Sequence, residues 1–199
     1  MFQYFSLFSQ ISVALVSIYF YKKYGHKKYY IFLLVFLCVT AIVESIGTYF
    51  LPTDFDIYFM SYSWALLQNI LLLMFFYFLL KKQIIFYFFI FFIVMWVYFF
   101  GCQQDLNKII ILSFLNAAIF SLLYLKELLI SDKIFFYKKL LPFWVSVGFL
   151  VFYLPSIPFF TLFKYMQNRG LFFIVNILII LMNLFIIYGL LCSNKEEKY

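Results

Sequence analysis

The sequence predicts an all-α integral membrane protein, a bundle of seven transmembrane helices in one domain covering residues 1–199. Composition is the first observation behind this prediction: 67% of the residues are hydrophobic and 12% are charged, against about half and about a quarter in soluble domains. The second is that apolar runs of about 18 to 24 residues recur between charged breaks, and each can cross a bilayer as a helix. Lipid is therefore the expected solvent.

The breaks between apolar runs are short, so consecutive helices are expected to be antiparallel neighbours. The expected spans are residues 2–21, 29–51, 57–80, 84–101, 109–130, 140–163 and 171–192. The first run lacks a basic leading region and a small-residue cleavage site, so we interpret it as a helix rather than a cleavable signal.

Lys and Arg are distributed unevenly about the predicted bundle. Twelve fall in the first, third and fifth loops, at the end of the fifth span and in the C-terminal tail, whereas Lys108, Lys164 and Arg169 fall on the other side. The positive-inside rule then places the N-terminus outside and the C-terminus in the cytoplasm, as expected in a bacterial inner membrane. The net charge of +7 is explained by headgroup contacts, and no nucleic-acid partner is expected.

An internal similarity relates the first three spans to the last three. Residues 14–17 (ALVS) resemble residues 118–121 (AIFS), and the triplet that begins at Asn69 recurs at Asn176. With the 84–101 span as an inverting linker, these matches favour a 3+1+3 parallel repeat of the kind found in some transporters. Short matches between apolar segments also arise by chance.

Glu44 is the only acidic or basic residue in the 29–51 run. A carboxyl group inside a membrane helix usually faces a partner or a wet cavity. Thr40 and Thr48 lie four residues before and after it, on the same helix face. Glu44 is interpreted either as a ligand contact, ion contact or protonatable switch, or as a structural carboxyl hydrogen-bonded to a nearby Asn or Tyr.

Other polar side chains occur at a similar predicted depth on neighbouring spans. They include Gln10, Gln68 and Ser113 as well as several asparagines. Their shared depth predicts a small pocket that opens outward, and interhelical hydrogen bonding is the alternative. The candidate ligand-binding or proton-coupling residues are Glu44, Thr40, Thr48, Asn69, Asn116 and Asn176.

Proline and tryptophan add two local predictions. Pro142 suits the first turn of its helix, and Pro155 should kink or end the helix, as a moving part or as a simple curve. Trp64 and Tyr165, near span ends, are typical of interfacial anchors.

No catalytic, cofactor or metal site is predicted. His26 is the only histidine, and Cys38, Cys102 and Cys192 lack metal-ligand spacing. There is no nucleophile elbow, zinc-protease motif or phosphate-binding loop, and the 171–192 span has no lysine for a retinal Schiff base. We therefore expect no enzymatic activity and no cofactor.

The 140–163 span begins Pro142-Phe-Trp144 and continues with Gly148, Leu150 and Tyr153. Together with Glu44 and the closing Leu190-Leu-Cys192, it resembles small seven-helix membrane proteins of Bacteroidota. Some of these accompany two-component signalling genes, so the resemblance implies a sensor with a separate cytoplasmic protein partner.

Three functional hypotheses follow from the sequence. The first is a sensor or signalling accessory with a polar pocket in the outer half of the membrane. The second is a small-solute transporter that uses Glu44 for proton or cation coupling, and the third is a structural or pore-forming subunit. The sequence does not indicate the ligand or the oligomeric state.

Overall fold

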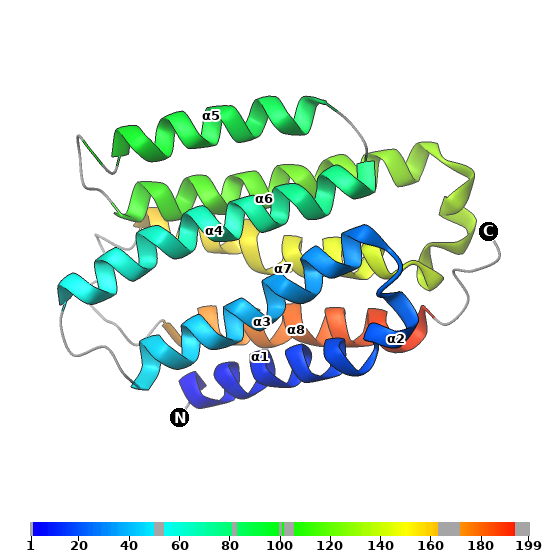
Figure 1. The fold of residues 1–199 in the computed structure, drawn as a ribbon, viewed down its shortest axis with the longest axis horizontal. Helices are drawn as coiled ribbons and strands as arrows, with labels where there is room; N and C mark the ends of the chain where they lie inside the picture. The colour runs from blue at the N-terminus through cyan, green and yellow to red at the C-terminus, as the bar shows by residue number, and fades with distance from the viewer. Residues whose placement is uncertain are drawn as a thin grey trace.

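The computed structural model describes residues 2–49, 54–80, 83–99, 101, 106–162 and 172–193, and these ranges contain helices and no strand. The all-α prediction is thus confirmed for the described residues. The helices are α1 (Phe2–Tyr19), α2 (Tyr21–Tyr24), α3 (Lys28–Tyr49), α4 (Asp54–Leu80), α5 (Ile84–Tyr98), α6 (Leu106–Ile130), the 3-10 helix η2 (Asp132–Lys139), α7 (Leu141–Leu162) and α8 (Phe172–Cys192) (Figure 1).

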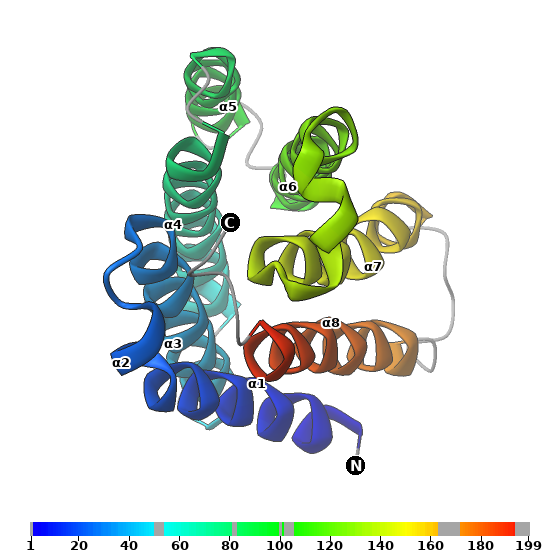
Figure 2. The same cartoon turned by 90° about the vertical axis from the view of Figure 1, so that its right-hand side faces the viewer.

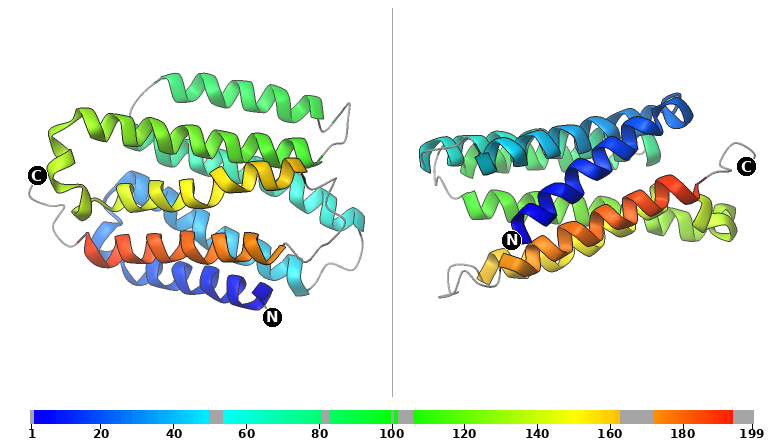
Figure 3. Two further views of the ribbon diagram at one scale, coloured as in Figure 1. Left: turned by 180° about the vertical axis from the view of Figure 1, so that it is seen from behind. Right: turned by 90° about the horizontal axis from the view of Figure 1, so that it is seen from below.

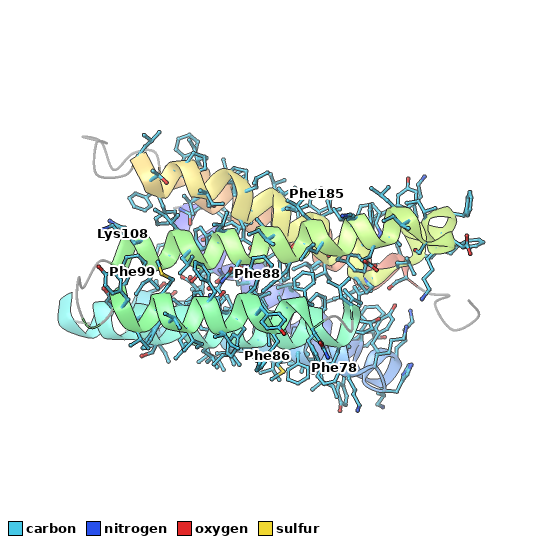
Figure 4. All side chains as sticks on the ribbon, turned by 90° about the horizontal axis from the view of Figure 1, so that it is seen from above. Phe78, Phe86, Phe88, Phe99, Lys108 and Phe185 are labelled. Atoms are coloured by element: carbon cyan, nitrogen blue, oxygen red, sulfur yellow. The ribbon has the colours of Figure 1, made fainter. Side chains whose placement is uncertain are left out.

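Five of these helices, α3, α4, α6, α7 and α8, are long and apolar enough to cross a membrane, and α1 and α5 are shorter apolar helices. Large apolar side chains cover the outside of the bundle, such as Phe8 on α1, which is 70% exposed. On α5, Phe86 is exposed while Phe88 packs inward with its ring 6.1 Å from that of Phe120 (Figure 4). A surface of this kind requires lipid as its solvent, so the chain is a multi-pass integral membrane protein.

Six helices form a closed ring, in the order α1, α3, α4, α6, α7, α8 and back to α1. The shorter apolar helix α5 packs on α4 and α6 outside the ring (Figure 2). Within the ring, α3 and α7 run opposite to the other four (Figure 1). One end of the bundle carries α2 and η2 with their lysines, including Lys22, Lys23, Lys133 and Lys138; we call it the lysine-rich end.

A set of phenylalanines packed edge-to-face or tilted fills the middle of the helix ring. The ring centroid of Phe149 lies 5.6 Å from that of Phe36, 6.3 Å from that of Phe75 and 6.4 Å from that of Phe76. Phe76 also packs against Phe120 at 5.9 Å. All five side chains are buried, and the separations suit edge-to-face packing. We call these five residues the aromatic cluster.

The helix bounds differ from the predicted spans at a few places. The breaks after the first and fifth spans contain short helices, α2 and η2, that the apolar pattern did not predict because they are polar and too short for a periodic signal. Pro142 lies in the first turn of α7, as predicted. Pro155 does not end the helix: α7 continues through Pro155 and Pro158 to Leu162 (Figure 3).

Helices α7 and α8 approach each other closely at two glycines. A Cβ on Gly189 would lie 2.6 Å from the Trp144 Cβ, and a Cβ on Gly148 would lie 3.0 Å from the Met182 carbonyl oxygen. Small residues at such contacts let membrane helices pack backbone to backbone. We therefore expect Gly189→Ala to lower the free energy of unfolding by about 1–3 kcal/mol, the usual effect of overpacking.

The measurement is unfolding in mixed micelles by SDS titration. Gly101→Ala is the matched control, because nothing lies within 4 Å of a Cβ at that position. Equal stability of the Gly189→Ala and Gly101→Ala variants would show that α7 and α8 do not pack as described.

Candidate functional site

A cavity of about 220 Å³ lies inside the helix ring. All six ring helices contribute to its wall, from Gln10 on α1 to Met182 on α8. We call it the central cavity. Its polar lining consists of Gln10, Thr40, Glu44, Gln68, Ser113 and Tyr153.

Aromatic rings form much of the remaining wall. Trp64 stacks on Phe36 with 6.2 Å between ring centroids and 26° between planes. Phe114 packs edge-on against Phe160 at 5.4 Å and against Phe152 at 5.6 Å. The central cavity is therefore an apolar, aromatic chamber with a few polar groups, which is the usual composition of a small-molecule site.

A second cavity, of about 240 Å³, lies beside the first at the end of the bundle away from the lysine-rich end. Ser6, Thr48 and Asn176 line this end cavity, from α1, α3 and α8. Glu44 and Ile179 line both cavities. The Glu44 side chain is exposed, and it lies where the two cavities meet, about 7 Å along α3 from the last residue of the helix.

Hydrogen bonding divides the polar groups of the central cavity into two sets. Gln68 donates from Nε2 to the Tyr153 hydroxyl at 2.7 Å, and Thr40 donates to the carbonyl of its own helix at Phe36. In contrast, Gln10 Oε1 and Ser113 Oγ are buried without a hydrogen-bond partner among the described residues. A buried, unpaired polar atom costs free energy unless water or a ligand satisfies it.

The structure brings four of the six predicted site residues to the cavities: Glu44 to both, Thr40 to the central cavity, and Thr48 and Asn176 to the end cavity. Asn176 accepts a hydrogen bond from Ser6 Oγ at 2.9 Å. The Thr48 hydroxyl donates back to the Glu44 carbonyl.

Asn69 and Asn116 are placed elsewhere. They are buried between α4 and α6, where Asn116 Nδ2 donates to Asn69 Oδ1 at 3.5 Å, and Asn69 also donates to the Ala65 carbonyl. Neither belongs to the described lining of the two cavities. This pair hydrogen-bonds α4 to α6, so these two asparagines follow the interhelical hydrogen-bonding alternative and not the pocket prediction.

Four polar residues of the central cavity, Gln10, Gln68, Ser113 and Tyr153, were not among the predicted site residues. For the first three, the only signal in the sequence was a depth similar to that of Glu44, which does not distinguish the inner face of a helix from a contact face. Trp64 is also placed differently from its prediction: it lines the cavity rather than the bundle surface. Tyr165 lies outside the described residues.

Among the described residues, no group of three His, Cys, Asp or Glu side chains could hold a metal ion. Cys38 and Cys192 are free thiols, and Cys102 lies outside the described residues.

A third cavity, of about 480 Å³, opens at the lysine-rich end. Lys27, Glu127, Lys133 and Lys139 line it. Along α4, α6 and α7, the residues of the aromatic cluster lie between those that line the central cavity and those that line this basic cavity. The two cavities thus lie within the same ring of helices and are separated by the packed phenylalanine side chains of the aromatic cluster.

No protein-family model, no curated protein and no solved structure matches the chain. Function is therefore inferred from the geometry of the cavities.

The bond between Gln68 and Tyr153 joins α4 to α7 across the central cavity. Tyr153→Phe leaves Gln68 Nε2 without this acceptor, and we expect the free energy of unfolding to fall by about 0.6–1.5 kcal/mol. The free energy of unfolding is measured by SDS titration in mixed micelles. Tyr87→Phe is the matched control because Tyr87 is exposed on α5; equal losses in both variants would mean that the buried bond contributes nothing.

Proposed function

We propose that this protein is a membrane receptor that binds a small solute in the central cavity and reports its presence to a cytoplasmic protein partner. The observation that carries the proposal is that all six ring helices line the cavity. An occupant there contacts every ring helix at once. Any difference in its affinity for two arrangements of the ring then shifts the balance between them.

The aromatic cluster offers a physical connection from the cavity to the lysine-rich end. Phe36 belongs to both the cavity wall and the cluster, and Phe149 packs against Phe36 and, at 5.7 Å, against Tyr153 of the wall. Rearrangement of the wall would move these rings, because close-packed interiors transmit displacement. The proposed output surface is η2, where Phe135 is 81% exposed among lysines. A role without catalysis or cofactor is part of this proposal.

Transport is the second candidate, and the order of helices in the ring favours it. Exchanging α1 with α6, α3 with α7 and α4 with α8 reproduces the same set of neighbours, with α5 left outside. This is the arrangement expected of a 3+1+3 parallel repeat. Cavities at both ends of the ring, separated by the aromatic cluster, would serve as the two halves of a translocation path.

Both candidates share the proposed topology, with seven crossings, an outside N-terminus and a cytoplasmic lysine-rich end in a bacterial inner membrane. In a cysteine-free background, Lys108→Cys should react with a membrane-impermeant maleimide added to intact spheroplasts. Lys133→Cys, in η2 beyond the other end of α6, should react only after lysis. The opposite labelling pattern would invert the topology.

Receptor and transporter predict different consequences of Glu44→Gln. Proton flux is measured in proteoliposomes with a pH-sensitive dye in the lumen and an imposed potassium diffusion potential. If the protein is a receptor, neither the parent protein nor Glu44→Gln conducts protons. A dye on Lys133→Cys should nevertheless change its emission when Glu44→Gln is introduced, because the cavity and the lysine-rich end are coupled.

Proton flux through the parent protein that Glu44→Gln abolishes would instead establish the transporter. Unchanged dye emission in Glu44→Gln would show that the central cavity and the lysine-rich end are not coupled, and it would contradict the receptor proposal.

A further inference from the structure

The described lining of the central cavity contains an acidic side chain and no basic one. Glu44 is the only charged residue in its described lining, and no Lys, Arg or His is among the lining residues. Lys27, Lys133 and Lys139 line the third cavity, beyond the aromatic cluster. An occupant of the central cavity that carries positive charge would thus meet a carboxylate and no cationic side chain in the described lining.

One of the two unpaired polar atoms, Gln10 Oε1, requires a hydrogen-bond donor, whereas the Ser113 hydroxyl can donate or accept. Gln10 is 5% exposed and Ser113 is 1% exposed, yet Gln10 Oε1 and Ser113 Oγ have no hydrogen-bond partner among the described residues. An amide oxygen only accepts hydrogen bonds. Together with the Glu44 carboxylate, Gln10 Oε1 gives the cavity two groups that only accept, which a ligand with N–H groups would satisfy.

The aromatic wall determines which kind of cation fits. The faces of Trp and Phe rings attract an ammonium through their quadrupole, and they shelter apolar substituents. Metal ions in proteins are usually held by several carboxylates, imidazoles or thiolates. Glu44 is the only such side chain in the described lining, beside Phe36, Trp64, Phe152 and Phe160.

We propose that the central cavity binds a small organic ammonium ion. Its N–H groups donate to the Glu44 carboxylate and to Gln10 Oε1, and its apolar part lies against the stacked rings of Trp64 and Phe36. Entry is through the end cavity, where Asn176 and Thr48 lie beside Glu44. This inference rests on the proposed ligand-binding function and specifies the chemical class of the ligand.

The test uses the full-length chain in phosphatidylcholine nanodiscs. The double variant Trp96→Phe/Trp144→Phe leaves Trp64 as the single tryptophan, because the chain contains three. Its emission is titrated with butylammonium, with its neutral analogue 1-butanol and with the anion butyrate. We expect a saturable change with butylammonium and at least about tenfold weaker binding of butanol and butyrate, since a charge-assisted bond is lost.

Variants locate the site. Glu44→Gln should raise the Kd for butylammonium by about tenfold or more. Glu127→Gln, the matched carboxylate of the basic cavity, should leave it unchanged. Gln10→Leu should raise it several-fold, and it tests the site independently if Glu44→Gln fails to fold by size-exclusion chromatography and circular dichroism.

The possible failures are distinguishable. Equal binding of butanol, or a Kd that survives Glu44→Gln and Gln10→Leu, would overturn the ammonium class while leaving a ligand-binding cavity. The absence of any saturable change with butylammonium would overturn the inference outright. The proposed receptor function has its own test, the dye at Lys133→Cys, which involves no ammonium ligand.

Discussion

Hydrogen bonding of the backbone in a solvent that offers no partners is the constraint on which this structure depends. In hydrocarbon each N–H and C=O must be satisfied within the protein, so apolar runs of this length become helices. Lipid does not drive helices together as water does. Close contacts such as those at Gly148 and Gly189, and the edge-to-face rings of the aromatic cluster, therefore hold the ring closed.

Closure of the ring produces the site. Helices arranged around a common centre leave a space that no single helix could enclose, and the side chains at that depth determine its chemistry. Toward the lysine-rich end the space is filled by the aromatic cluster. Farther along, the same helices carry Gln10, Gln68, Ser113 and Glu44, and the space remains open as the central cavity. One bundle thus combines a packed half that can transmit displacement with an open half that can accept a ligand.

Much of the fold was predictable because it follows from one-dimensional signals. Helix positions agree with the apolar runs to within a few residues, and Pro142 lies in a first turn. The short helices α2 and η2 were missed because they lack such a run. The site was predictable in part: Glu44, Thr40 and Thr48 share one helix face, so their proximity follows from helical spacing. The directions in which Asn69, Asn116 and Trp64 point depend on how their helices are rotated relative to their neighbours. The placement of these three side chains differs from the expectation.

From the sequence alone it follows that the chain is helical, that it resides in a membrane and that Glu44 is an unusual group within it. These properties depend on composition, run length and i,i+4 spacing, all of which are local. The tertiary structure decided the order of helices in the ring, the exclusion of α5 and the choice of polar residues that face the cavity. Those properties depend on the rotation and neighbours of each helix, and apolar residues around the whole circumference leave no periodic signal from which rotation can be read.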